Sequence, residues 1–158
     1  MKGINIAETC HVTAGQYPVA TSGLTTLDAV NMENYSHLTA IILAGVANGT
    51  GQTVTVLNSS DASATGAAAI AFNYYKTITA AGDVLGARTA ATTAGFLLSH
   101  GTVSSTKYVI ELDASELTDG LNWVNLTFSG ETSTTPTSVV YILSGSRYAS
   151  PASVSAIA

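Results

Sequence analysis

The sequence predicts an all-β protein folded as an antiparallel β-sandwich with extended arms at both ends. Apolar residues recur at every second position or in short uninterrupted runs, which are the two patterns typical of β-strands. Segments containing Gly, Asn, Asp or Pro separate these runs, and apart from one short turn no stretch keeps the 3.6-residue period of a helix. About seven strands with turns between them fit a sandwich. A jelly roll or a barrel is compatible with the same pattern.

The chain divides into a central domain and two ends of different composition. Residues 1–30 mix single apolar residues with Gly and Pro, and we predict an N-terminal arm with a short edge strand there. Residues 31–148 carry the strand patterns and form the predicted sandwich domain. Residues 149–158 are uncharged and form the predicted C-terminal tail. Free tails are usually more polar, so packing of either end on a neighbouring subunit is an alternative to simple fraying.

The predicted strands differ in how many of their faces are buried. Residues 40–43 and 139–143 are apolar at consecutive positions, which predicts central strands covered on both faces. Alternating segments predict strands buried on one face, and these segments are residues 53–56, 70–78, 108–112 and 123–128. Residues 96–98 are a shorter candidate. Within the segment 70–78 the alternation predicts one buried face made of Ile70, Phe72, Tyr74 and Ile78.

Turn signals fall between these strands. Residues 47–51, Ala-Asn-Gly-Thr-Gly, follow the first apolar run and fit the loop of a hairpin to the next strand. Residues 80–83, 118–120 and 130–137 carry the other turn signals. Residues 113–116, Asp-Ala-Ser-Glu, have the spacing of a capping box, which predicts one helical turn.

The content of charged residues is low and excludes several classes of partner. Five Lys and Arg and ten Asp and Glu make up 9% of the 158 residues, against about 25% in an ordinary soluble domain. Small neutral residues take their place: 24 Ala, 23 Thr, 17 Ser and 14 Gly. Five scattered basic residues cannot neutralise a nucleic-acid backbone or form a polybasic membrane patch. We therefore expect neither nucleic acid nor a membrane as a partner.

The search for catalytic or cofactor chemistry is mostly negative. The single cysteine, Cys10, excludes an internal disulfide and a cysteine-based metal site. The three histidines, His11, His37 and His100, are far apart and lack metal-ligand spacing. No nucleotide-binding glycine loop and no nucleophile-elbow motif occurs. We expect no cofactor and no enzymatic activity.

Four residues are candidates for specific surface contacts because of their place in a strand. Glu111 and Asp113 are two positions apart and share the polar face of one strand, where paired carboxylates can do acid–base work, bind a hard cation or simply be solvated. Tyr75 and Trp123 fall on the more polar faces of their strands. They can form a sugar-binding platform or cover an interface, and we favour the interface.

The two arginines, Arg88 and Arg147, are the more specific candidates for interface contacts, because the chain has so few charged residues. Each is expected to have a fixed carboxylate or carbonyl partner, and that partner can lie within the chain or on a neighbouring subunit. Both alternatives stay open. Together with the four residues above, they complete the set of candidate interface residues.

Several stretches resemble small virion proteins of tailed bacteriophages. They are residues 69–76 (AIAFNYYK), 86–96 (GARTAATTAGF), 108–117 (YVIELDASEL) and 139–148, which ends in Ser-Gly-Ser-Arg-Tyr. The resemblance covers roughly residues 30–150 and implies a capsid decoration (cement) protein. It implies a virion structural protein, made in the bacterial cytoplasm, that binds the outer surface of the capsid as an oligomer with the major capsid protein as partner. The resemblance carries no active site. We expect a homo-oligomer, with a trimer favoured over a dimer.

Three alternatives to this function remain. The exposed aromatic residues fit a carbohydrate-binding or adhesive module on the virion surface. A tail or head–tail structural protein would have the same sequence features as a head protein. A hydrolase built on Glu111 and Asp113 is the third and least favoured alternative.

Overall fold

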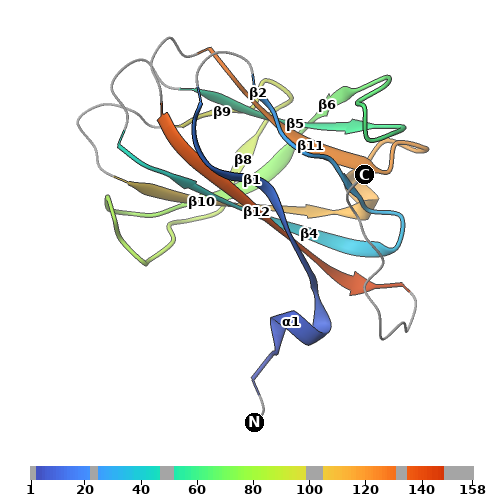
Figure 1. Cartoon of the computed structure of the whole chain (residues 1–158), viewed down its shortest axis with the longest axis horizontal. Coiled ribbons are helices and arrows are strands. Elements are labelled where there is room, and N and C mark those ends of the chain that lie inside the picture. Colours follow the sequence, from blue (N-terminus) through green and yellow to red (C-terminus); the bar gives the residue numbers. More distant parts are fainter. Residues whose placement is uncertain (1–2, 22–24, 47–51, 99–104, 131–134, 148–158) are drawn as a thin grey trace.

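The structure, a computed structural model, describes residues 3–21, 25–46, 52–98, 105–130 and 135–147. It confirms the predicted sandwich, because two antiparallel sheets pack face to face (Figure 1). Sheet A contains, in spatial order, β1 (His11–Thr21), β12 (Thr135–Ser146), β4 (Tyr35–Ala44), β10 (Thr106–Asp113), β7 (Phe72–Lys76) and β8 (Thr89–Ala91). Sheet B contains β2 (Thr25–Thr26), β11 (Trp123–Ser129), β5 (Thr53–Ser59) and β6 (Ala68–Ile70). Two short strands join sheet B from the side: β3 (Val30–Asn31) pairs with β11, and β9 (Phe96–Leu97) pairs with β5.

The order of the strands is that of a jelly roll. β1 pairs with β12, β2 and β3 pair with β11, β4 pairs with β10, and β5 pairs with β6, as in one long hairpin. Rolling that hairpin brings β12 against β4 and β11 against β5, which completes the two sheets. β7 and β8 then extend sheet A beyond β10. Of the alternatives left open by the sequence, the strand order selects the jelly-roll sandwich.

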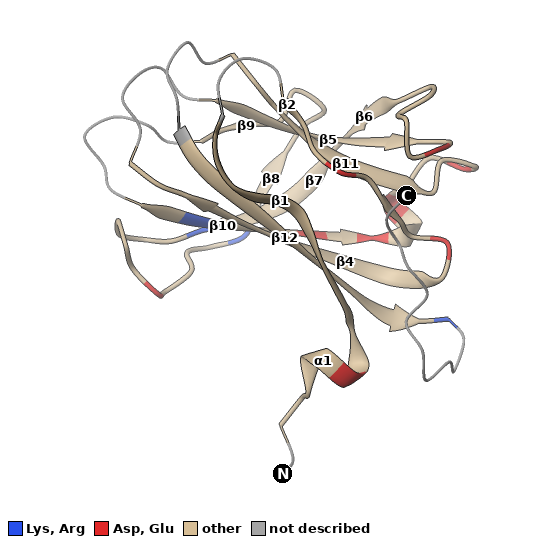
Figure 2. Ribbon diagram, in the orientation of Figure 1, with Lys and Arg blue, Asp and Glu red and all other residues tan. Residues whose placement is uncertain are grey.

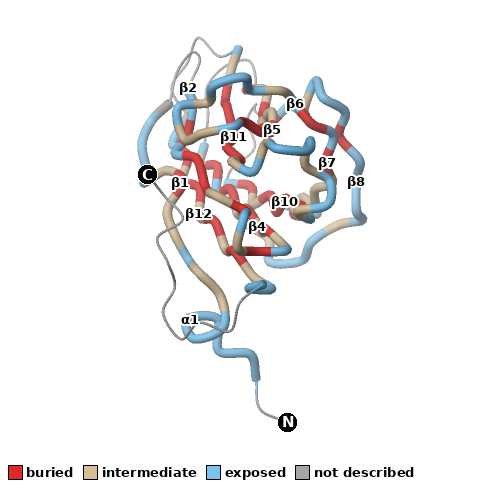
Figure 3. The backbone as a smooth tube through the Cα atoms, turned by 90° about the vertical axis from the view of Figure 1, so that its right-hand side faces the viewer, coloured by how far each residue is buried: buried red, intermediate tan, exposed pale blue. Residues whose placement is uncertain are grey.

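The hydrophobic core lies between the two sheets. The alternating residues Val124, Leu126 and Phe128 of β11 are fully buried against Ile42 of β4 and Tyr141 of β12. Figure 3 shows buried stretches on strands of both sheets, among them β4, β5 and β11, and exposed stretches at the periphery. Burial of each large apolar side chain stabilises the fold by about 1.5–3 kcal/mol, so the inward alternation of the strands determines the sandwich.

Three details of the sequence prediction are confirmed. Tyr74 packs on the core, and its ring stacks on that of Phe96 with 4.2 Å between the centroids. Residues 96–98 do contain a strand, β9. The 3₁₀ helix η1 (Ala114–Glu116) follows Asp113, whose backbone N–H donates to the Glu116 carboxylate at 2.8 Å, as the capping box requires.

Three other details are wrong, for reasons that lie in long-range packing. The loop 47–51 is outside the described residues, but the strands that it joins, β4 and β5, belong to different sheets and form no hairpin. Both edges of β4 are already paired, with β12 and β10, so no edge is left for β5. Ile78 is 67% exposed, because β7 ends at Lys76 and the alternation ends with it. β11 is buried on both faces, since Asn125 and Thr127 are buried as well.

The two ends of the chain lie at the margin of the sandwich. β1 is an edge strand of sheet A and includes residues of the predicted N-terminal segment 1–30. The short helix α1 (Ile6–Thr9) precedes it and projects from the body, and none of its residues is buried (Figures 1 and 3). The predicted C-terminal tail, residues 149–158, lies outside the described residues.

Candidate interaction surface

The outer face of sheet A carries a continuous row of mostly apolar side chains across five strands. Because residues directly opposite each other in an antiparallel sheet point to the same face, the strand registers define this row. It runs from β7 through β10, β4 and β12 to β1, and its members are Tyr75, Val109, Ile41, Val140 and Ala14. We call these five residues the middle row.

Two parallel rows flank the middle row on the same face. On one side, Lys107 of β10 lies opposite Leu43 of β4, which lies opposite Ser138 of β12. We call these three residues the lysine row. On the other side lie, from β7 to β1, the residues Asn73, Glu111, Thr39, Ile142 and Val12, which we call the glutamate row. We call the outer face of sheet A, with its three rows, the open face.

The open face lacks the cover that the inner face has. Leu43 is 50% exposed, and Ile41 and Val140 are half-buried, whereas their chain neighbours Ile42 and Val139 are completely buried against sheet B. Within the middle row, Val109 differs, because it is only 9% exposed in the single chain. Residues 40–43 and 139–143 do form central strands, as their composition predicts. The prediction that both of their faces are covered is wrong for this single chain, because a jelly roll has two layers and each sheet gains cover on one side. An apolar surface of this kind is typical of an interaction site.

The few charges of the open face are separated along β10. Lys107 stands near one end of the strand, and Glu111 and Asp113 stand toward the other. Figure 2 shows this separation as a blue segment and red segments on the same strand. The Lys107 ammonium group donates to a backbone carbonyl oxygen, that of Asp83, at 3.5 Å.

The acidic end of β10 holds a histidine between its two carboxylates. His37 of β4 lies opposite Asp113 in the register, and its ring Nδ1 is 2.7 Å from an Asp113 oxygen. Its Nε2 is 2.7 Å from a Glu111 oxygen, and that same oxygen accepts a hydrogen bond from the Thr39 hydroxyl at 2.7 Å. Partial burial disfavours the charged ring, but the hydrogen bonds and negative charges of Asp113 and Glu111 outweigh it and raise the pKa of His37.

This histidine cluster is poorly suited to catalysis or metal binding. Both ring nitrogens of His37 face a carboxylate, so neither is free to accept a proton from a substrate or to bind a metal ion. In the described part of the chain, no group of three or more His, Cys, Asp and Glu side chains has the arrangement of a metal site. Sequence reasoning identified Glu111 and Asp113 but missed His37, because only the pairing of β4 with β10 brings it to them.

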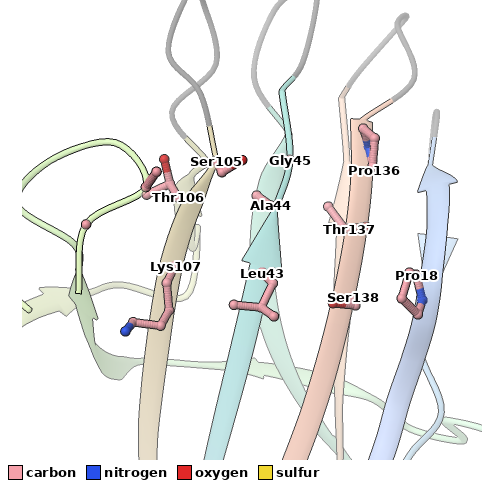
Figure 4. Close-up of a pocket in the computed structure, with 12 residues that line it drawn as sticks. Pro18, Leu43, Ala44, Gly45, Ser105, Thr106, Lys107, Pro136, Thr137 and Ser138 are labelled. Carbon is pink, nitrogen blue, oxygen red and sulfur yellow. The ribbon is translucent and has the colours of Figure 1, made fainter.

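A shallow hollow lies at the loop end of the open face. It has a volume of about 420 Å³ and opens between Leu43, Lys107, Pro136 and Pro18, which come from β4, β10, β12 and β1 (Figure 4). The surface of the hollow is mainly apolar, and its lining also includes Ser105, Thr106, Lys107, Thr137 and Ser138.

The six candidate residues from the sequence are distributed unequally over the two sheets. Tyr75 belongs to the middle row, Glu111 belongs to the glutamate row, and Asp113 ends β10 on the same face. Trp123 begins β11 in sheet B, so Tyr75 and Trp123 do not share one aromatic platform.

The two arginines lie at ends of strands in sheet A. Arg88 directly precedes β8, and Arg147 directly follows β12 and donates its backbone N–H to the Asn34 carbonyl oxygen at 3.0 Å. Both side chains are exposed, and within the described ranges neither makes a hydrogen bond or ion pair. The alternative of a partner on a neighbouring subunit therefore stays a prediction.

Comparisons with known proteins find distant similarity to solved structures. No family model matches the chain, and no curated protein matches it. The crystal structure of the SPBc2 prophage-derived protein YomS is similar, with 12% identity and a TM-score of 0.44 over 84% of this chain and 94% of that one. A chain of the T13 IBDV viral particle is similar at 10% identity and a TM-score of 0.25, over 87% of this chain and 39% of that one. At these values neither similarity supports a functional argument. No helix in the described residues is long and apolar enough to span a bilayer.

Proposed function

We propose that this chain is a non-enzymatic structural protein of a phage virion that binds the outer surface of the capsid as a homo-oligomer and stabilises the shell. The observation that carries the proposal, through its homo-oligomer, is the open face, where Leu43 is 50% exposed and Ile41 and Val140 are only half-buried in the single chain. The sequence resemblance to tailed-phage decoration proteins supplies the capsid as the partner.

The physical argument concerns solubility and repeated contacts. With charged residues at only 9%, a free monomer has few charges to keep its copies apart, so its surface is better suited to being covered. On a shell, the same contact is repeated many times. An oligomer attached at several points binds far more tightly than any single contact, so modest complementarity at each site is sufficient.

The fold agrees with this proposal only by analogy. Jelly rolls occur in viral capsid proteins and in lectins, and a fold by itself does not define a function. For the lectin alternative, the placement of Tyr75 and Trp123 on different sheets removes the platform that motivated it. For the hydrolase alternative, Glu111 and Asp113 are both engaged by His37.

The test uses capsids of the parent phage assembled without this protein. We expect the purified chain to co-sediment with these shells saturably and to raise the temperature at which they disrupt. A folded, oligomeric protein that leaves both sedimentation and disruption temperature unchanged would overturn the capsid proposal. Binding to a glycan array in that case would support the adhesive module instead.

A further inference from the structure

The geometry points to the open face as the contact between two copies of this chain, which pack face to face about a two-fold axis with their strands antiparallel. The inference rests on the proposed function for the expectation of an oligomer and names the partner of this face, a second copy. It is argued from the protection of the sheet edges, the apolar middle row and the separation of charge along β10.

The sheet edges are poorly suited to joining copies. β1, the long edge of sheet A, has two irregularities in its pairing with β12 and contains Pro18, which lacks a backbone donor. The opposite edge strand, β8, has three residues, and the sheet B edges β2 and β6 have two and three. Short, bulged or proline-containing edges are the devices by which proteins prevent strand addition. Between two copies of this chain, a face-to-face contact through sheet A covers its apolar residues, which a contact between strand edges would leave exposed.

The charges select one of the two ways in which the faces can stack. A two-fold axis that runs along the middle row, across the strands, reverses the strand direction and lays β10 on the partner's β10. Val109 is midway between Lys107 and Glu111 in the strand. The lysine row of one copy therefore lies over the glutamate row of the other, with Lys107 facing the partner's Glu111 twice, once on each side of the axis.

The other two-fold axis, along the strands, is disfavoured by charge. It preserves the strand direction, so the acidic end of each face, with Glu111 and Asp113, would lie against the same end of the partner. Like charges brought together across a contact cost several kcal/mol, about the same size as the stability of a weak complex. The separation of charge thus favours the antiparallel stack.

In that stack the middle row packs on itself. The half-buried Ile41 and Val140 each meet their own counterparts, while Val109, already buried in the single chain, lies beside Ile41 on the axis. Sheets packed face to face lie about 10 Å apart, a distance that side chains of this size fill. A contact in which the same patch is used by both copies is complete with two. This inference therefore expects a dimer, where sequence reasoning alone favoured a trimer.

The first experiment measures the mass of the full-length protein in solution by sedimentation. We expect twice the 16.0 kDa of one chain. Ile41→Asp places a charge in the middle row and should yield a folded monomer. Leu97→Asp, at an exposed position of β9 in sheet B, is the matched control and should remain a dimer. A wild-type monomer or trimer, or a dimer that Ile41→Asp leaves intact, would overturn the inference.

The second experiment tests the stacking direction by charge reversal. Lys107→Glu alone and Glu111→Lys alone should each weaken the dimer by about tenfold or more, because each creates two like-charged pairs. The double variant restores opposite charges across the axis and should recover most of that loss. Circular dichroism confirms that each variant is folded. Equal weakening by the single and double variants would refute the pairing of Lys107 with the partner's Glu111.

The third experiment cross-links two positions of the middle row, because a two-fold axis along the strands can place at most one of β4 and β12 over its own counterpart. In a Cys10→Ser background, Ile41→Cys and, separately, Val140→Cys should each be joined to the same residue of the partner by a short bismaleimide, whereas Leu97→Cys should not. A bismaleimide is needed because a disulfide requires Cα atoms within about 7 Å, whereas sheets packed face to face lie about 10 Å apart. Cross-linking of only one of the two positions, or of neither, within a proven dimer would rule out the axis along the middle row. A dimer that does not bind capsids would refute the proposed function but not this inference. A monomer that binds capsids through Ile41 would overturn this inference and leave capsid binding standing.

Discussion

Substitution of Gly95 tests the fold, because the expected loss of stability can be derived from the structure. It lies in the turn between β8 and β9, where its backbone N–H donates to the Thr92 carbonyl oxygen at 2.9 Å. Its φ angle is +77°, in the left-handed region that glycine tolerates and other residues avoid. A Cβ at this position would overlap the Val54 carbonyl oxygen of β5 and lie 2.8 Å from the Thr55 methyl group. Gly95→Ala therefore meets two separate penalties.

A second glycine separates the two penalties. Gly120 has a φ of +78°, but a Cβ there would meet nothing within 4 Å. The left-handed conformation destabilises alanine by about 1–2 kcal/mol. Alanine also lowers the conformational entropy of the unfolded chain, which stabilises the fold by roughly 0.4–1 kcal/mol. Gly120→Ala should thus lose about 1 kcal/mol. At Gly95 the clash with β5 adds roughly 1–3 kcal/mol, as overpacking does elsewhere, for a total of about 2–4 kcal/mol.

The assay is urea denaturation followed by circular dichroism at one fixed protein concentration, because self-association makes stability depend on concentration. In thermal melts the Gly95→Ala loss corresponds to a decrease in Tm of roughly 10 °C, and the Gly120→Ala loss to about 2–4 °C. Equal losses for the two variants would refute the reasoning, since they would show that β9 does not approach β5 as closely as the structure has it.

Three further predictions concern the core, the histidine cluster and one arginine. Leu126→Ala, at a fully buried site of β11, should cost about 2–5 kcal/mol in urea denaturation, and a loss below about 1 kcal/mol would contradict its burial. The raised pKa of His37 should make the wild-type Tm fall as pH rises through that value, because its stabilisation is complete only below the unfolded pKa of about 6.5. His37→Gln should lack this part of the pH dependence. Arg147→Ala should shift the oligomer toward monomer with an unchanged β-rich spectrum if its partner is on another subunit, and an unchanged mass would show that this pair is not essential.

Local patterns in the sequence were sufficient for much of the fold. The alternation in residues 108–112 and 123–128 predicted strands β10 and β11, because a strand turns successive side chains to opposite faces whatever it pairs with. The capping box at Asp113 and the core position of Tyr74 were predictable for the same reason. Each of these features depends on residues within a few positions of one another.

The candidate surface depended on information that a local pattern does not contain. The hairpin expected at residues 47–51 failed because β4 is paired with β12 and β10, strands that are distant in sequence. The same registers bring His37 to Asp113, 76 positions away, and align the middle row across five strands. The low content of charged residues predicted a surface that other molecules cover. The apolar runs 40–43 and 139–143 predicted the central strands that contribute to that surface. The tertiary structure alone decided which face stays open and where its charges stand, because register is set by the packing of the whole core and a shift by one residue would turn every side chain to the other face.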